Sequence, residues 1–254
     1  MSRIDFLNPT NEERLLFAKI CDLCERAERG RMCFSRFLNL REQEIAKAAL
    51  SPYNVTSLFY GGFEGSEKAM LGLCGSDTDL EESYFPMSLL TLEFPKNAEF
   101  SHRDVLGSLM ALGIERNSVG EIFLYENKAS FPVISSIEDT VFREMVTVGK
   151  YSVKIVPYEG DGIIKKETED RTCVISSMRL DCVISAVTGK SRSTSAALIK
   201  KQPVFINDKK CDKIDEPVPE GAVLTIRGFG KFKLSEEVKK TSKDRLRIVI
   251  SKYI

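Results

Sequence analysis

Residues 178–234 constrain the fold most, because two short helical patterns are followed there by several short strand patterns. The first helical pattern opens at Arg179, and its apolar residues recur three and four positions apart, which places them on one helix face. These residues are Leu180, Val183, Ile184 and Val187. Gly189 is expected to end this helix, and Ser191 to cap a second one. The stretch therefore predicts two helices joined by a very short connection.

Strand patterns follow the helix pair at residues 204–206, 223–227, 228–234 and 245–250. Pro203 has no N–H group, so we expect it to begin a strand or to lie on a sheet edge. Asn207 and Asp208 both tolerate positive φ, which predicts a turn directly after the first strand. Together these patterns predict a small sheet with the helix pair on one side and most of the cations on the helical side.

This arrangement resembles the S4 RNA-binding module. The matching residues are RLD at 179–181, SRS at 191–193, LIKK at 198–201, VFIND at 204–208 and RGFGKFKL at 227–234. The sequence departs from the family pattern at three places: Gln202-Pro203 and Asp208 replace expected glycines, and Ala222 replaces an aspartate. The resemblance implies that this segment binds structured RNA.

The charge of the chain is divided unevenly between its two parts. The 37 Lys and Arg residues balance 37 Asp and Glu residues, so the formal net charge is zero. Residues 171–254 nevertheless hold 18 Lys and Arg against 9 Asp and Glu, a net charge of +9, whereas residues 1–170 carry −9. This division is typical of a basic domain that contacts phosphate groups. The alternative, that these cations only keep a small domain soluble, does not explain their clustering in the S4-like segment.

Composition and length indicate an ordinary globular protein of two or three domains. Hydrophobic residues make up 43% of the chain and charged residues 29%. No segment approaches 18 consecutive apolar residues, and the N-terminus lacks the apolar core of a signal peptide, so we expect a cytoplasmic protein without a membrane span. The 7 cysteines have no framework spacing, which favours reduced thiols over disulfides.

Residues 1–82 are expected to form an N-terminal domain of helices and a hairpin. Helices are predicted at residues 11–29 and 40–50, with Asn11 as the cap of the first. Cys21 and Cys24 form a lone C-x-x-C motif in the first helix. A structural zinc site needs four ligands, so core cysteines are favoured over a metal site.

A glycine-rich motif, GGFEG at residues 61–65, joins two strands that are predicted at residues 55–60 and 68–74. The motif is not followed by Gly-Lys-Ser/Thr, and it connects strand to strand rather than strand to helix. Both observations argue against a nucleotide phosphate loop. We therefore expect a hairpin connection at this position.

Residues 83–158 follow the order β-α-β-β-α-β, which ferredoxin-like and RRM-like domains share. The predicted elements are strand 89–94, helix 101–112, strands 121–125 and 129–134, helix 137–148 and strand 151–156. An RRM stacks bases on exposed aromatic rings of its sheet. Phe123, Tyr125 and Phe131 are candidates for this role, although the full RNP1 motif is absent. RNA contact through this sheet face therefore stays open.

The segment FSHRDVLGSLMALGIERNSVGEIFL at residues 100–124 resembles the bacterial YlmH family, as do YGGFEG at residues 60–65 and the S4-like unit. This resemblance spans most of the chain. It implies a non-enzymatic protein that binds ribosomal RNA and peptidyl-tRNA on the large ribosomal subunit and takes part in the rescue of stalled nascent chains. Members of the family are often encoded near cell-division genes.

The candidate RNA-binding residues lie mainly in the S4-like unit, where an arginine at a helix N-terminus would bind phosphate together with free backbone N–H groups. The candidates are Arg179, Lys190, Ser191, Arg192, Ser193, Lys200, Lys201, Asn207, Arg227 and Lys231. His102 and Arg103, at the start of a predicted helix, form a possible second contact. A role of His102 in fixing that turn is an equal alternative.

Two functions from other classes remain as alternatives. One is an RNA-modifying enzyme, such as a pseudouridine synthase or methyltransferase, that the S4-like unit directs to its substrate. The sequence lacks a glycine-rich cofactor loop after a strand, and its only RLD motif lies inside the S4-like unit. The other is a cell-division interaction protein whose acidic N-terminal half binds a protein partner.

The predicted architecture is an α+β protein of three parts: an N-terminal domain (1–82), an RRM-like domain (83–158) and, after a polar linker at 158–171, an S4 domain (172–254). We expect a monomer that uses no cofactor, no metal and no catalytic residue.

Overall fold

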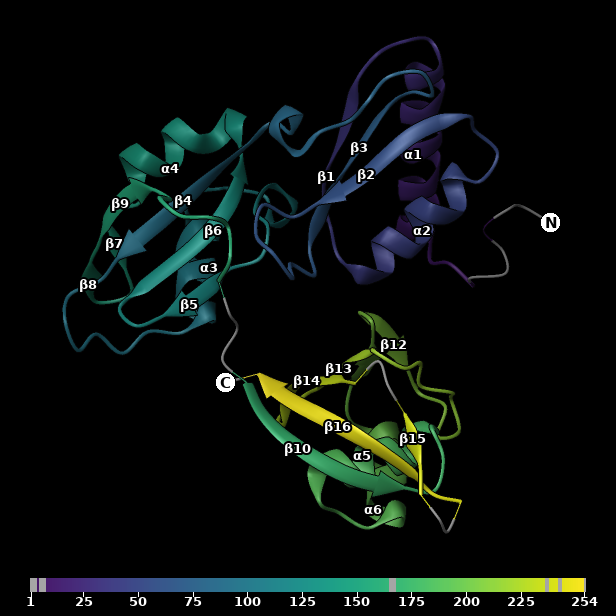
Figure 1. Cartoon of the computed structure of the whole chain (residues 1–254). Helices are drawn as coiled ribbons and strands as arrows, with labels where there is room; N and C mark the ends of the chain where they lie inside the picture. The colour runs from purple at the N-terminus through teal and green to yellow at the C-terminus, as the bar shows by residue number, and fades with distance from the viewer. Residues whose placement is uncertain (1–3, 5–7, 165–167, 236–237, 242–243, 254) are drawn as a thin grey trace. The chain divides into compact units, whose positions relative to one another are not determined.

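A computed structural model describes residue 4 and residues 8–164, 168–235, 238–241 and 244–253. The chain divides into two compact units, Met1–Lys165 and Lys166–Ile254 (Figure 1). Both combine helices with antiparallel sheets, so the predicted mixture of helix and strand is confirmed. The first unit contains both the predicted N-terminal and middle domains, and their independence stays a prediction. No helix in the described part of the chain is long and apolar enough to cross a membrane.

The first part of unit 1 is a three-stranded antiparallel sheet with two helices. Its elements are α1 (Asn11–Glu28), β1 (Cys33–Leu38), α2 (Leu40–Leu50), β2 (Val55–Tyr60) and β3 (Ala69–Gly75). The strand order is β1-β3-β2. The predicted hairpin is confirmed as the antiparallel pair of β2 and β3, and β1 adds a third strand that was not predicted. The register of β1 shifts between Phe34 and Phe37, which interrupts the alternation that marks a strand in sequence.

A capping box fixes the start of α1. The Thr10 backbone N–H donates to the Glu13 carboxylate over 2.7 Å, and the Glu13 N–H donates to the Thr10 hydroxyl over 3.2 Å. The N-cap is therefore Thr10 and not Asn11 as predicted. Cys24 of this helix is fully buried, and burial raises the pKa of its thiol to about 12. Cys24 is a core residue, as the helical pattern predicted.

The second part of unit 1 is a four-stranded antiparallel sheet in the order β5-β6-β4-β9. Its strands and helices are β4 (Met87–Glu93), α3 (His102–Ala111), β5 (Phe123–Tyr125), β6 (Lys128–Ile134), α4 (Glu138–Glu144) and β9 (Lys154–Pro157). Short elements complete it: η2 (Glu82–Tyr84), η3 (Arg116–Ser118), η4 (Ser135–Ile137), β7 (Thr147–Val148) and β8 (Tyr151–Ser152). The predicted β-α-β-β-α-β order is present, with the β7–β8 hairpin inserted before the last strand. Helices α3 and α4 share one core with the sheet, which includes Leu90, Leu109 and Val141.

Phe63 of the GGFEG motif covers the sheet face opposite this core. Its ring centroid lies 5.2 Å from that of Phe123 and 4.9 Å from that of Tyr158. A Cβ atom at Gly62 would lie 2.7 Å from Cδ2 of Leu89, and Gly62 has φ +83°. Only glycine therefore allows the motif to lie this close to the sheet. The glycines serve backbone conformation and packing.

Part of the predicted 158–171 linker is packed structure. The Tyr158 N–H donates to the Leu89 carbonyl over 2.8 Å, and the Glu64 N–H donates to the Gly162 carbonyl over 2.9 Å. The residues from Thr168 onward belong to a strand of unit 2. The linker prediction was therefore wrong at both ends, because polar composition did not reveal these backbone hydrogen bonds.

Unit 2 places two helices against one face of an antiparallel sheet. The helices are α5 (Leu180–Thr188) and α6 (Arg192–Lys201). The strands are β10 (Thr168–Ile175), β11 (Val204–Ile206), β12 (Lys209–Cys211), β13 (Val223–Ile226), β14 (Gly230–Leu234), β15 (Lys239–Lys240) and β16 (Leu246–Tyr253). The sheet order is β10-β16-β14-β13-β11-β12, and β15 pairs with β16. Leu180, Ile184 and Leu198 of the helices pack with Leu224 and Ile250 of the strands in one core.

The local predictions for unit 2 hold where the backbone demands particular residues. Pro203 directly precedes β11, and Gly189 ends α5 with φ +69°. Asn207 and Asp208 have φ +48° and +61°, so the turn forms without a glycine. Strand β10 was not predicted, because five of its eight residues, Thr168 to Thr172, are exposed and polar.

Candidate nucleic-acid interface

The N-terminal ends of α5 and α6 place two of the candidate arginines beside one buried carboxylate. Arg179 is the N-cap residue of α5, and Arg192 is the first residue of α6. Ser191 caps α6 by accepting a hydrogen bond from the Thr194 N–H over 3.2 Å. Because the α5–α6 connection is so short, both arginines lie close to Asp181 in the first turn of α5.

Asp181 holds both guanidinium groups. Arg192 donates from Nη2 and Nε to Oδ2 of Asp181 over 2.6 and 3.2 Å, and Arg179 donates from Nε to Oδ1 over 3.2 Å. The Asp181 side chain is 7% exposed, whereas those of Arg192 and Arg179 are 57% and 45% exposed. The carboxylate therefore fixes two cations that still present surface to solvent. Fixed guanidinium groups can bind phosphate with less loss of side-chain entropy than free ones.

The pKa of Asp181 lies below its ordinary value. Burial acts to raise this pKa, but the hydrogen bonds and charges of Arg192 and Arg179 outweigh burial. The same hydrogen bond raises the pKa of Arg192. Because the folded-state pKa is depressed, the ionised carboxylate stabilises the fold fully above the unfolded pKa of about 3.9. That stabilisation is lost as the pH falls through the lower folded-state pKa.

Replacing Asp181 with asparagine is expected to lower the free energy of unfolding by about 1–2 kcal/mol at pH 7, since it removes hydrogen bonds to charged groups that are partly screened by solvent. The difference from the wild type should shrink below about pH 4 and vanish below the folded-state pKa. Urea unfolding followed by circular dichroism across pH 2–7 measures it. A difference that stays constant with pH would contradict the role of the ionised carboxylate.

The other candidates on the helical side are exposed cations and hydroxyl groups. Lys200 and Lys201 lie in the last turn of α6. The Lys190 ammonium lies 5.9 Å from the centroid of the Phe229 ring. Arg227 directly follows the core residue Ile226 of β13, and its N–H donates to the Pro203 carbonyl, so strand alternation does not place it on the helical side as predicted. The Ser193 hydroxyl lies 3.0 Å from that of Ser191. We call Lys190, Ser191, Ser193, Lys200 and Lys201, together with Arg179 and Arg192, the helical surface.

Two further candidates are placed elsewhere. Asn207 is half-buried, and its side-chain carbonyl accepts a hydrogen bond from the Val223 N–H over 2.8 Å, which stabilises the turn. Lys231 belongs to β14, where its neighbour Phe232 is buried in the core beneath the helices. Because side chains alternate along a strand, Lys231 lies on the opposite sheet face. The expectation that Lys231 completes the helical surface was therefore wrong, and strand alternation at Phe232 and Leu234 is the signal that would have shown it.

His102 and Arg103 occupy the first turn of α3, and both are exposed. The predicted capping box is present: Asp104 Oδ2 accepts hydrogen bonds from the Ser101 N–H and hydroxyl over 2.9 and 2.7 Å. These hydrogen bonds lower the pKa of Asp104. A carboxylate thus already lies at this helix N-terminus, so a phosphate would compete with it there.

The suggestion of an RRM-like stacking surface was wrong for two of its three aromatic residues. Phe123 and Phe131 are 3% and 0% exposed, the first beneath Phe63 and the second in the core with α3 and α4. Tyr125 is half-buried, and its hydroxyl lies 2.7 Å from that of Ser130. Composition alone could not show that the GGFEG motif covers this face.

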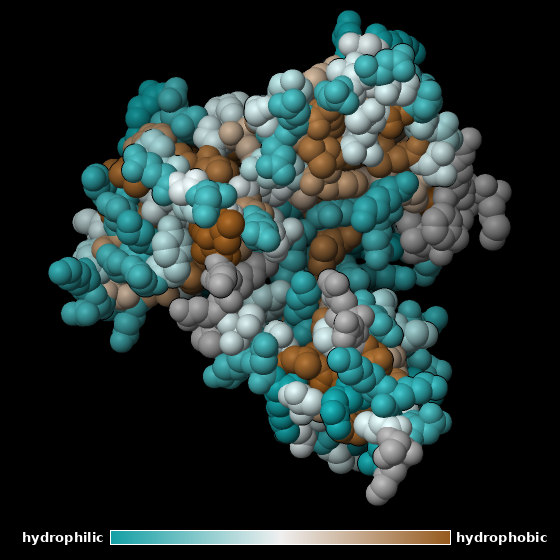
Figure 2. All heavy atoms as spheres, in the orientation of Figure 1, coloured by the Kyte–Doolittle hydropathy of each residue, from teal (hydrophilic) through white to brown (hydrophobic). Residues whose placement is uncertain are grey.

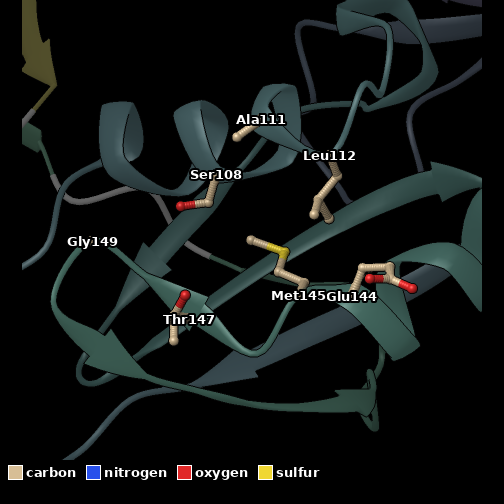
Figure 3. Close-up of a pocket in the computed structure, with 7 residues that line it drawn as sticks. All are labelled: Ser108, Ala111, Leu112, Glu144, Met145, Thr147 and Gly149. Carbon is tan, nitrogen blue, oxygen red and sulfur yellow. The ribbon is translucent and has the colours of Figure 1, made fainter.

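A pocket of about 220 Å³ opens beside the end of α3 (Figure 3). Its lining residues are Ser108, Ala111, Leu112, Glu144, Met145, Thr147 and Gly149. None of these lining residues is a cation, and the carboxylate of Glu144 repels phosphate. The pocket therefore does not offer a nucleic-acid site. Among the described residues, no group of three His, Cys, Asp or Glu side chains could hold a metal ion.

Comparison with known proteins gives concordant results. The family described as "Putative RNA-binding domain in YlmH" matches residues 81–161. A protein of Bacillus subtilis (strain 168) named "Ribosome-associated protein quality control protein P2" is 31% identical over 228 residues, which cover 89% of each chain. A solved structure, "Cell division protein ylmH from Streptococcus pneumoniae", has a TM-score of 0.52 at 21% identity and covers 59% of this chain and 93% of its own. The last likeness concerns the fold alone.

Proposed function

This chain belongs to the YlmH family, and we propose that it binds structured ribosomal RNA or tRNA on the large ribosomal subunit during quality control of stalled nascent chains. The named relative supports the ribosomal setting, because it carries ribosome-associated quality control in its name. The matched family supports RNA as the ligand. We place the protein in the cytoplasm as a monomer.

The observation that carries this proposal is the arginine pair on Asp181. Unit 2 follows the order of an S4 module, with two helices before its central strands, and the helical surface gathers most of the predicted cations. Two guanidinium groups fixed by a buried carboxylate match the phosphates of a folded RNA, whose backbone is recognised by shape more than by sequence. We therefore assign the RNA contact to the helical surface of an S4-like unit.

We also propose that the chain does not catalyse a modification of the RNA that it binds. The motifs that an S4-directed pseudouridine synthase or methyltransferase would need are missing from the sequence, and RLD lies at the start of α5. In the structure the carboxylate of Asp181 in this motif accepts hydrogen bonds from Arg179 and Arg192. This arrangement is suited to positioning cations rather than to catalysis. Incubation with ribosomal RNA, followed by mass spectrometry of its nucleosides, is expected to give no modified product. A stoichiometric product would favour the enzyme alternative.

Sedimentation with ribosomes tests the main proposal. The intact chain is expected to co-migrate with large subunits on a sucrose gradient, and the Arg192→Ala, Lys200→Ala double variant to be released into the light fractions. Each removed phosphate contact lowers affinity by about tenfold, since a charge-assisted hydrogen bond contributes about 1.5 kcal/mol. Lys19→Ala, Arg26→Ala is the matched control, because it removes two exposed cations from α1. Co-migration that survives the α6 changes would move the RNA contact away from the helical surface.

A further inference from the structure

The sheet of unit 2 has a second face, opposite the helices, that the helical surface does not explain. Residues that face the core alternate with residues that face away along each strand. Cys173 and Ile248 pair across β10 and β16 and belong to the core, so their neighbours Thr172 and Val249 face outward. In Figure 1, β10 and β16 pass in front of α5, so this outward face is turned to the viewer.

A continuous row of side chains crosses this face from one edge of the sheet to the other. Phe205 pairs with Lys210 on one side and with Thr225 on the other, and Thr225 pairs with Lys231. The Lys231 ammonium lies 5.6 Å from the centroid of the Tyr253 ring, and Tyr253 pairs with Thr168. The order across the six strands is Lys210, Phe205, Thr225, Lys231, Tyr253 and Thr168. We call this set the outer row.

The outer row lies within a cationic face. Lys233 pairs with Ser251, and Arg247 pairs with Lys239, so three more cations face the same way. Among the described strand residues of this face, the register adds one acidic side chain, Asp170, opposite Ser251 at the β10 edge. Figure 2 shows hydrophilic residues around a smaller hydrophobic group on this side of unit 2. Five cations against one anion make the face complementary to a polyanion.

The alternation of cations and aromatic rings favours single-stranded RNA over other polyanions. Single-stranded nucleic acids bind where a positive surface follows the backbone and aromatic rings stack on the bases. In a duplex the faces of the bases are stacked on one another, so they are not free to stack on the aromatic rings of the protein. Phe205 is half-buried and lies between Lys210 and Thr225, so an unpaired base can stack on it while a cation contacts the neighbouring phosphate. An acidic protein surface would use the cations but not this aromatic spacing.

We propose that the outer row binds a single-stranded segment of RNA, on the sheet face opposite the helical surface. Neighbouring strands are about 4.8 Å apart, so Lys210 and Lys231, three strands apart, are separated by about 14 Å along the row. This span lets several consecutive nucleotides cross the sheet. The inference rests on the proposed function only in taking RNA as the ligand, and it extends the contact to a second face.

The test compares two RNA probes on the full chain: a blunt hairpin, and the same hairpin with a single-stranded uridine tail. The wild type is expected to bind the tailed hairpin at least about fivefold more tightly, the effect of stacking one base. The Lys210→Gln, Phe205→Leu variant should bind both probes about equally. For this variant, the slope of log affinity against log salt concentration on the tailed probe should also become shallower by about 0.7, the value for one single-strand phosphate contact.

Two matched variants make the result specific. Lys252→Gln removes one exposed cation from β16 at a position next to Tyr253 in sequence, and should keep the preference for the tailed probe. Arg192→Gln should weaken binding of both probes by the same factor and also keep the preference. Two outcomes would overturn the outer row as the binding site. One is that the Lys210→Gln, Phe205→Leu variant still prefers the tailed probe; the other is that Lys252→Gln loses this preference as completely as that variant does. Wild-type protein that binds the hairpin without any preference overturns this inference alone, whereas failure to bind either probe also overturns the proposed function.

Discussion

Replacing both Arg179 and Arg192 with alanine is expected to lower the affinity for structured RNA about a hundredfold at physiological salt. Both guanidinium groups are held on Asp181, with hydrogen bonds of 2.6 to 3.2 Å, and both keep an exposed part. A charge-assisted contact with phosphate contributes about 1.5 kcal/mol, and 1.4 kcal/mol corresponds to a factor of ten. Fluorescence anisotropy with a labelled ribosomal RNA hairpin measures the change.

The salt dependence of binding identifies the origin of this loss. About five phosphate contacts on the helical surface imply a log–log slope near −3.5 to −4.5 for the wild type, and removal of two contacts should make the slope shallower by about 1.4–1.8. Arg192→Lys is the matched control, because lysine keeps the charge but cannot bind phosphate bidentately. It should keep the wild-type slope with lower affinity. An affinity that does not respond to salt would contradict the electrostatic account of the interface.

Gly62→Ala is expected to destabilise unit 1 by about 3 kcal/mol or more. A positive φ costs an L-residue about 1–2 kcal/mol, and forced overpacking adds about 1–3 kcal/mol. Both costs apply at Gly62, which has φ +83° and where a Cβ atom would lie 2.7 Å from Leu89 Cδ2 and 3.1 Å from Pro132 Cβ. Urea unfolding followed by circular dichroism measures the change in the free energy of unfolding.

Gly65, in the same motif, provides the matched control. It has φ +72°, and a Cβ atom at this position would meet no heavy atom within 4 Å. Gly65→Ala should therefore carry only the backbone cost of about 1–2 kcal/mol. The difference between the two variants reports how closely the GGFEG motif packs on the four-stranded sheet. Equal effects would mean that the clash at Gly62 is relieved by movement of its neighbours.

Sequence patterns predicted the elements whose residues meet strict local demands. The capping box of Ser101 and Asp104, the left-handed Gly189 and the turn at Asn207 and Asp208 are all present as expected. Each depends on side chains or backbone angles within a few residues. Such features can be predicted without any knowledge of distant parts of the chain.

Features that depend on distant partners were missed or misplaced. Strand β10 was not predicted, because Thr168 to Thr172 are polar and exposed and its partner, β16, begins about 70 residues after β10 ends. The burial of Phe123 depends on Phe63, which lies in the connection between β2 and β3. The RGFGKFKL motif placed Lys231 in the S4-like unit, but it did not show on which face of the sheet Lys231 lies. Family resemblance thus identified a set of cations, and only the strand register divided that set between two faces.

The strand β16 has a consequence for how unit 2 is made. It pairs with β14 and β15, which shortly precede it in the chain, and with β10, which is synthesised about 70 residues earlier. Until β16 has left the ribosomal exit tunnel, β10 and β14 each lack a hydrogen-bonding neighbour, and open strand edges promote aggregation. Unit 2 therefore cannot complete its sheet during translation of its earlier strands. A molecule truncated before β16 would lose both of the proposed RNA-binding surfaces together, since the strand that closes the sheet supports each of them.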